Sequence, residues 1–282
     1  MTAYLSIRGL TVTLKGGGVI LRDVSLDVAA GQVHGLVGES GAGKSMIGKA
    51  VLGTLPRAMQ ITSGEIWLDG IDLLGLPSRR RRHHIGASAA LIPQDPLTAL
   101  NPVRRVGPQI TRRLVDILGW TRSAAQSRAL ELLDEVQIPD PSRVMRSYPH
   151  ELSGGMRQRI LIAAAFAAEP KLIIADEPTT ALDVTVQKQI LRLIAQMQTR
   201  HDTALLFVTH DLGVVSKICD SLSVLYAGKV IEEAQMRAFF AAPKHPYSAA
   251  LLAATPTHTN PESSLTPVPQ AIIDAVEAEV RS

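Results

Sequence analysis

The sequence predicts an α/β fold in which helices cover a buried, mostly parallel sheet. Hydrophobic residues make up 46% of the 282-residue chain, enough for a substantial core, and aromatic residues only 4%. The apolar content is therefore mostly Ala, Leu, Val and Ile, the mixture expected where helices pack on a buried sheet. In addition, short apolar runs alternate with longer segments of helical periodicity.

The first hundred residues are rich in strand and turn signals. The first two strands are separated by three glycines, so they are expected to form a hairpin. In order, we predict strands at 4–14, 19–28 and 33–37, a helix at 44–55, and strands at 65–68 and 87–92. The third strand reaches its helix through a glycine-rich loop, which is the context that a phosphate site needs.

The rest of the chain predicts an inserted helical region followed by a return to the sheet. Helical spacing dominates from 102 to about 137, and two apolar strands at 172–175 and 204–209 enclose a helix at 184–199, which indicates a parallel βαβ unit. Strands at 221–226 and 229–232 suggest a closing hairpin. The composition then shifts to Pro, Thr, Ser and Asn, so 255–270 is interpreted as a surface tail.

Charge and cysteine content exclude several classes of protein. The formal net charge is only +3, so nucleic acid is not an expected partner. The one dense basic run, from Arg79 to His84, is interpreted as a solvated helix face and is assigned no role. The single cysteine, Cys219, excludes an internal disulfide and a cysteine-rich metal site, so we expect a reducing compartment and a small buried side chain.

Neither a signal peptide nor a membrane span is predicted. Residues 1–5 lack the basic and apolar regions of a signal peptide, so we expect the chain to stay in the cytoplasm. The longest apolar stretch, 160–168, falls well short of the roughly 20 residues that span a bilayer. We therefore expect that the chain does not cross a membrane unaided.

A phosphate-binding loop is the first motif with a chemical meaning. Residues 38–45 fit G-x-x-x-x-G-K-[ST], in which glycines let backbone N–H groups converge on phosphate oxygens. Lys44 is expected to reach the β- and γ-phosphates as a catalytic residue, and Ser45 to hold Mg²⁺. The predicted nucleotide-binding residues are Gly38, Glu39, Ser40, Gly41, Ala42, Gly43, Lys44 and Ser45. The alternative, a plain glycine turn, does not explain the strand before and the helix after.

An acidic pair follows the apolar strand at 172–175. Open α/β sheets bind ligands at the carboxyl ends of their strands, which is where Asp176 and Glu177 lie. Asp176 suits the Mg²⁺ shell, and Glu177 is expected to polarise the attacking water in phosphoryl transfer. By itself such a pair is more often a solvated strand end, so its interpretation depends on the other motifs.

The segment 152–159, Leu-Ser-Gly-Gly-Met-Arg-Gln-Arg, resembles the signature motif of ABC ATPases. Its serine hydroxyl, glycine N–H groups and helix N-terminus can form an anion site, although an ordinary helix start is the alternative. In that family the motif binds the γ-phosphate of the nucleotide held by the opposite subunit, so one chain would supply two half-sites. The residues concerned are Ser153, Gly154, Gly155, Met156, Arg157 and Gln158.

Three further positions match this family in order. Gln94 resembles the Q-loop glutamine, which contacts Mg²⁺ or water and faces the transporter's coupling helix, so it is also expected to be a nucleotide-binding residue. Asp183 resembles the D-loop aspartate, and His210 resembles the switch histidine that contacts the γ-phosphate. A histidine at a strand end is by itself more often a cap or a surface residue, but its place after the other motifs favours the switch.

The resemblance, over roughly residues 4–256, implies a RecA-like P-loop NTPase fold with an antiparallel β subdomain. The ATPase domain would span 1–254, with a helical subdomain at about 97–165 inserted, and 255–282 would be a C-terminal tail. Segments 92–102, 148–159 and 174–184 look like the peptide and nickel importer branch. His245-Pro-Tyr resembles that branch's H-P-Y segment, although a proline-bounded surface helix is the alternative.

Two departures from the family pattern limit the resemblance. Leu14 occupies the place where many ABC ATPases have an aromatic residue that stacks on adenine, so base stacking is expected to be weaker. Several peptide-importer ATPases also have a cysteine cluster for an iron–sulfur centre beyond the H-P-Y segment. With Cys219 alone, no such cluster is expected here.

The resemblance implies an ATP- and Mg²⁺-dependent ATPase at the cytoplasmic face of the cell membrane, energising uptake of short peptides, nickel or metal chelates. Its implied partners are an identical or paralogous ATPase subunit, two transmembrane permease subunits and, indirectly, an extracytoplasmic solute-binding protein. An exporter motor is the main alternative. An ABC ATPase that acts on DNA or ribosomes would be expected to show a second cassette, a long coiled coil or a strongly basic surface. A binding or regulatory module that holds ATP without hydrolysing it would be expected to lack Glu177 or His210.

Overall fold

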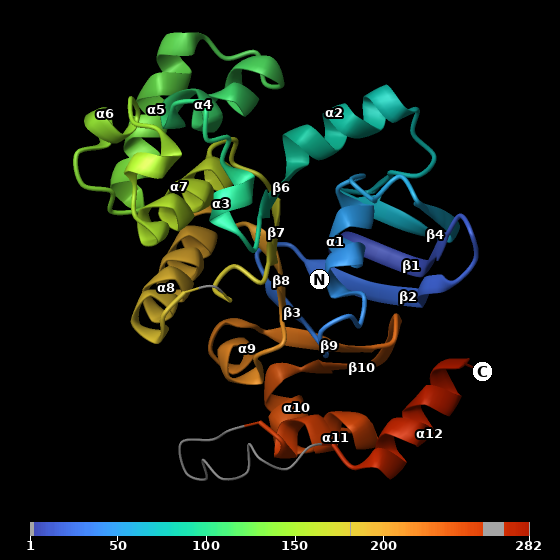
Figure 1. Cartoon of the computed structure of the whole chain (residues 1–282). Helices are drawn as coiled ribbons and strands as arrows, with labels where there is room; N and C mark the ends of the chain where they lie inside the picture. Colours follow the sequence, from blue (N-terminus) through green and yellow to red (C-terminus); the bar gives the residue numbers. More distant parts are fainter. Residues whose placement is uncertain (1–2, 181, 256–267, 282) are drawn as a thin grey trace. The chain divides into compact units, whose positions relative to one another are not determined.

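The computed structural model describes residues 3–180, 182–255 and 268–281 (Figure 1). The chain forms two compact units. The discontinuous unit consists of Met1–Leu76 and Leu206–Ser282, and the central unit consists of Pro77–Leu205. The predicted phosphate loop and His210 belong to the discontinuous unit, whereas the acidic pair, Gln94 and the signature segment belong to the central unit.

An antiparallel sheet forms one part of the discontinuous unit. Its strands are β1 (Ala3–Leu14), β2 (Val19–Ala29), β4 (Met59–Leu68) and β5 (Ile71–Asp72), in the order β2-β1-β4-β5. Alternate residues of β1, such as Leu5 and Ile7, are buried, as expected where one face of a sheet packs on a core. The predicted glycine-turn hairpin of β1 and β2 is confirmed, with Ile7 opposite Leu26.

The second set of strands in this unit combines one strand from the first part of the sequence with three strands from after residue 203. It consists of β3 (Val33–Val37), β8 (Ala204–Thr209), β9 (Ser221–Tyr226) and β10 (Lys229–Gln235), in the order β10-β9-β3-β8. β3 and β9 are parallel, and β9 and β10 form the predicted closing hairpin. Every residue of β3 and β8 is buried, which explains why their sequences are continuous apolar runs.

His34 is an unexpected polar residue in this buried sheet. Its Nδ1 lies 2.8 Å from the Ser221 hydroxyl and its Nε2 lies 2.9 Å from the Ser223 hydroxyl. Burial lowers the pKa of His34 to about 4, although the charge of Asp27 opposes this shift. The imidazole is therefore neutral at physiological pH and completes the strand pairing through its hydrogen bonds.

The helices of the discontinuous unit are α1 (Lys44–Val51), α9 (Leu212–Ile218), α10 (Met236–Ala241), α11 (Pro246–Ala253) and α12 (Gln270–Arg281). α1 ends four residues before the predicted end at 55. The chain turns away at Gly53, whose φ of 65° only glycine adopts readily, and Thr54 N donates to Lys49 O.

Within the segment interpreted as a C-terminal tail, 255–282, the structure contains the helix α12, which the sequence analysis did not predict. Val276 and Val280 are buried, and the helix contacts α11. Lys229 Nζ also donates to Glu279 O at 3.4 Å. Residues 256–267 of the predicted tail lie outside the described residues.

The central unit contains a parallel pair of strands, β6 (Ala89–Ile92) and β7 (Leu172–Asp176), in which Ile92 pairs with Ala175. The first residue of β8, Ala204, donates its N–H to Lys171 O beside β7, as the predicted βαβ unit requires. The helical elements are α2 (Ser78–Ser88), α3 (Pro96–Ala99), α4 (Val106–Asp116), α5 (Arg122–Glu135), α6 (Pro141–Val144), the 3₁₀ helix Pro149–Glu151, α7 (Gly154–Phe166) and α8 (Val184–His201).

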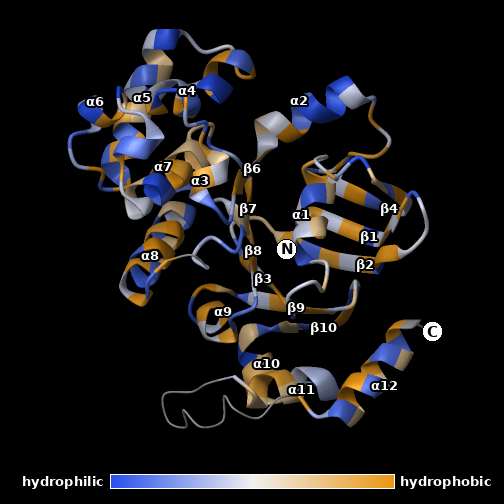
Figure 2. Ribbon diagram, viewed as in Figure 1, coloured by the Kyte–Doolittle hydropathy of each residue, from blue (hydrophilic) through white to orange (hydrophobic). Residues whose placement is uncertain are grey.

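Two sequence predictions about this unit need adjustment. The strand predicted at 87–92 begins at Ala89, because residues 87 and 88 complete α2. The helical region predicted from 102 to 137 is divided into α4 and α5 at Gly119, which has a φ of 70°. The N-terminal part of α2 is predominantly hydrophilic (Figure 2), in line with the interpretation of the basic run as a helix face.

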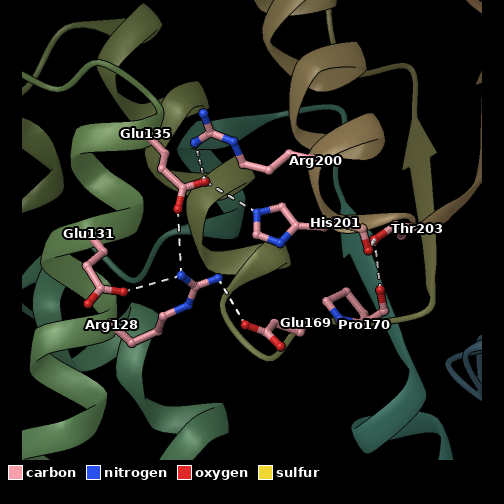
Figure 3. Close-up of polar contacts among 8 residues, drawn as sticks. All are labelled: Arg128, Glu131, Glu135, Glu169, Pro170, Arg200, His201 and Thr203. Atoms are coloured by element: carbon pink, nitrogen blue, oxygen red, sulfur yellow. Dashed lines mark hydrogen bonds and ion pairs between the residues drawn. The ribbon is translucent and has the colours of Figure 1, made fainter.

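A network of charged side chains joins α5 to the end of α8 and to the loop after α7 (Figure 3). Glu135 lies 3.1 Å from Arg200, 3.3 Å from His201 and 3.6 Å from Arg128. Arg128 also pairs with Glu131 and Glu169, each at 3.3 Å. The network therefore fixes one end of α5 within the central unit.

Across the described residues, none of the helices has both the length and the apolar character needed to cross a bilayer.

Candidate functional site

The phosphate loop connects β3 to α1 in a conformation that depends on glycine. A Cβ atom on Gly38 would lie 2.2 Å from Leu225 O, so a larger residue cannot occupy this position without moving β9. At Gly41, with φ of +85°, a Cβ atom would meet nothing within 4 Å. The loop therefore lies tightly against the sheet at its start and presents an open backbone at its middle, as a phosphate cradle requires.

Lys44 lies across the loop. Its side chain is buried, and Nζ donates to Gly38 O and Glu39 O, each at 2.8 Å. Because Lys44 is also the first residue of α1, the ammonium group and the positive end of the helix are on the same short segment. Ser45 follows and is partly exposed. The loop thus concentrates positive charge and N–H donors in one place.

Gln94 and Glu177, the second residue of the acidic pair, meet in the central unit. Ile92 and Ala175 are paired in β6 and β7, so the residues after both strands emerge at the same edge. Gln94 Nε2 donates to Glu177 Oε2 at 3.3 Å, although the two residues are 83 positions apart. Asp176 ends β7 and is partly exposed.

The Glu177 carboxylate accepts a second hydrogen bond besides the one from Gln94. The Thr180 hydroxyl donates to the same carboxylate oxygen at 2.9 Å, a contact that the sequence analysis did not identify. Glu177 also has a φ of 45°, a left-handed conformation that costs about 1 kcal/mol or more in a residue with a side chain. The carboxylate is therefore oriented by local structure, which suits a residue that must align a water molecule.

The signature segment begins α7. Ser153 is the N-cap residue, and its hydroxyl oxygen accepts from Met156 N at 3.3 Å. Ser153 and Gly154 are exposed, and a Cβ atom on Gly154 would meet nothing within 4 Å. The start of α7 therefore presents a serine hydroxyl and unobstructed backbone N–H groups, the features of an anion site.

Two signature residues have internal partners. Arg157 Nε donates to Pro149 O at 2.9 Å and to Leu152 O at 3.0 Å, which fixes the chain entering α7. Gln158 is fully buried and donates to Pro178 O at 2.9 Å. Gln158 thus ties the signature helix to the residue that follows Glu177.

The remaining predicted residues lie at helix starts or strand ends. Asp183 caps α8, where its carboxylate accepts from Thr185 N and Val186 N at 3.1 and 2.9 Å. His210 follows β8 and is exposed, directly before Asp211, which caps α9. Leu14 is the last residue of β1 and is partly exposed.

Cys219 lies away from these motifs in the sequence and is buried. Burial raises the pKa of its thiol far above the usual range, and the charge of Asp220 adds to this shift. The thiol is therefore protonated and packs as a small apolar side chain, which confirms that prediction.

Comparison with known proteins identifies related sequences over most of the chain. The family model described as "ABC transporter" matches residues 21–180, and a model described as an AAA domain, putative AbiEii toxin, Type IV TA system, matches residues 146–216. The probable D,D-dipeptide transport ATP-binding protein DdpD of Escherichia coli is 47% identical over 89% of this chain and 77% of its own length. The oligopeptide transport ATP-binding protein OppD of Bacillus subtilis is 43% identical over 95% of this chain and 76% of its own length.

Solved structures agree with the sequence relatives. The dimeric ATP-binding cassette MJ0796, bound to ADP and Pi, superposes with a TM-score of 0.72 at 25% identity, over 83% of this chain and 99% of its own. CbiO1 of Clostridium perfringens, part of the cbiONQ transporter complex, superposes with a TM-score of 0.75 at 25% identity, over 89% and 96%.

Proposed function

Because the chain belongs to the ABC transporter family, we propose that it is the ATP-binding and ATP-hydrolysing subunit of a transporter that imports short peptides. Its fold is the P-loop NTPase fold of that family. One observation supports the proposal most directly: a single chain contains both a phosphate loop bridged by Lys44 and an exposed serine-capped helix start at Ser153. Each of these features can hold the phosphates of a nucleotide.

We propose that the two features serve different nucleotides. In this arrangement, the phosphate loop binds ATP in its own subunit, and Ser153 with Gly154 contacts the γ-phosphate of ATP in a partner subunit. A dimeric cassette among the structural relatives supports this arrangement. The partner is either a second copy of this chain or a paralogue, and the pair works with two permease subunits at the cytoplasmic face of the membrane.

The donor set fits Mg²⁺ as the cofactor. Magnesium prefers oxygen ligands and keeps several waters, and the Ser45 hydroxyl, the Gln94 amide oxygen and the Asp176 carboxylate are all oxygen donors. When bound, Mg²⁺ would neutralise charge on the phosphates. The protein's own contribution is to orient Glu177 by Gln94 and Thr180, so that its carboxylate can accept hydrogen bonds from the attacking water.

The related proteins favour peptides as the transported substrate. Their names specify D,D-dipeptide, oligopeptide and dipeptide transport, and they match over most of this chain. They support the importer over the exporter alternative, because they belong to the branch that the H-P-Y segment resembles. Nickel and metal chelates remain the second candidate class, on the sequence resemblance alone.

The substitution Ser153→Arg tests the shared nucleotide site. We expect the variant to bind ATP as the unmodified chain does, because Lys44 and the phosphate loop are unchanged. ATP hydrolysis should nevertheless fall sharply, because a long cationic side chain would obstruct the site of the partner's γ-phosphate. ATP binding and steady-state hydrolysis by the purified subunit are the two measurements. Normal hydrolysis by Ser153→Arg would contradict the shared-site proposal.

A further inference from the structure

The H-P-Y segment contacts the phosphate loop in the discontinuous unit. Tyr247 lies in the first turn of α11, and its hydroxyl donates to Glu39 Oε1 at 2.7 Å, across 208 positions of sequence. Glu39 is the only acidic residue of the loop segment 38–45. The contact therefore joins the C-terminal part of the chain to the one loop side chain whose negative charge opposes a bound polyphosphate.

Tyr247 is held rigidly. It is 0% exposed and packs edge-on against Tyr226 at the end of β9, with ring centroids 4.8 Å apart. Burial raises the pKa of its hydroxyl well above the usual range, and the hydrogen bond to Glu39 adds to this shift. The phenol is therefore a permanent donor, and Glu39 the acceptor.

The segment before Tyr247 is fixed on two further sides. Glu232 of β10 accepts the N–H groups of Lys244 and His245 at 2.8 and 2.9 Å. The His245 ring bonds the Tyr247 N–H through Nδ1 at 3.1 Å and approaches Glu279 of α12 at 3.0 Å through Nε2. The position of the Tyr247 hydroxyl is thus determined by β10, α11 and α12 together.

Glu39 passes this constraint to the loop backbone. Its carbonyl oxygen accepts from Lys44 Nζ at 2.8 Å and from Ala42 N at 3.2 Å. Glu39 therefore contacts Tyr247 through its side chain and Lys44 through its main-chain carbonyl. On the other side of the loop, the Gly228 N–H donates to Ala42 O at 2.9 Å.

We propose that Tyr247 is a positioning residue that holds the phosphate loop, through Glu39, in its nucleotide-binding conformation. The inference rests on the proposed ATP-binding function and assigns a role to the H-P-Y segment. Tyr247 keeps the Glu39 carboxylate directed toward α11, so that the loop does not rearrange when ATP binds. Its loss should therefore weaken nucleotide binding and leave the hydrolytic step nearly unchanged, because Glu177 is not involved.

The test is the substitution Tyr247→Phe, which keeps the ring and removes the hydroxyl. We expect the ATP KM and the nucleotide dissociation constant to rise about 3- to 10-fold, with kcat within about twofold, since one hydrogen bond to a charged group is lost. The matched control is Ser248→Ala, which removes the next hydroxyl of α11. Ser248 is equally buried, and its hydroxyl faces Glu232 of β10 and not the loop, so KM should change by less than about twofold.

A second pair of variants separates positioning from packing. Glu39 is exposed, so Glu39→Ala is expected to fold, and in its background Tyr247→Phe should change KM by less than about 1.5-fold. Equal KM effects in both backgrounds, or equal effects of Tyr247→Phe and Ser248→Ala, would overturn the inference. A chain that binds no nucleotide even without substitution would instead refute the proposed function.

Discussion

Glu135 is expected to be the most important residue of the charged network that fixes α5. Its side chain is 17% exposed and contacts Arg200, His201 and Arg128, whereas Glu131, which contacts Arg128 alone, is 62% exposed. Glu135→Gln keeps the shape but removes the charge shared by three cationic or hydrogen-bonding partners. We expect it to lower the free energy of unfolding by about 1–2 kcal/mol, less than the 3–5 kcal/mol of a fully buried pair.

The pH dependence follows from the direction of the Glu135 pKa shift. Burial by itself would raise this pKa, but the hydrogen bonds from Arg200 and His201 and the charges of His201 and Arg128 outweigh burial and lower it below the usual range of a glutamate. A carboxyl group with a lowered pKa stabilises the fold above its unfolded pKa and loses that effect as the pH falls through its folded pKa. The difference between the unmodified chain and Glu135→Gln should therefore be full at pH 7 and shrink below about pH 4.5.

Urea unfolding at pH 7 and pH 4 measures both effects, with the midpoint compared at constant slope. The matched control is Glu131→Gln, an exposed member of the same network, which should cost about 0.5 kcal/mol or less. The reasoning is refuted if the two variants are equally stable at pH 7, or if the cost of Glu135→Gln grows as the pH falls.

Three further substitutions test the nucleotide site. Glu177→Gln should bind ATP normally but lower kcat by about 10²- to 10⁴-fold, the usual contribution of a residue that assists proton transfer, and its dimer should persist in ATP; unimpaired turnover would contradict the assigned role. Lys44→Ala should raise the nucleotide dissociation constant about 10-fold or more, as judged by equilibrium binding, and unchanged affinity would count against the loop assignment. Gly38→Ala should lower the free energy of unfolding by about 1–3 kcal/mol, because its methyl group would meet Leu225 O. The control Gly16→Ala should be nearly neutral, because no atom lies within 4 Å of the added Cβ. Equal stabilities of the two variants would refute the packing argument.

The elements that the sequence predicted well are those specified by local pattern. β8 spans 204–209 as predicted, because five consecutive apolar residues, 204–208, lie between Thr203 and Thr209 and mark the strand clearly. α1 was predicted four residues too long, since a glycine near a helix end can lie inside the helix or terminate it, and the left-handed φ of Gly53 is not visible in sequence. α12 was missed because composition after Ala254 suggested a tail, and its burial depends on contact with α11.

The sequence by itself determined the chemistry available to this protein. The glycine loop with Lys44, the acidic pair after β7 and the serine-capped helix start are contiguous motifs, each specified by residues within a few positions of one another. Contacts such as Gln94 with Glu177, His34 between Ser221 and Ser223, and Tyr247 with Glu39 were decided only by the tertiary structure. They join residues 83 to 208 positions apart, and such contacts depend on strand order and helix packing, for which a single sequence contains no local signal.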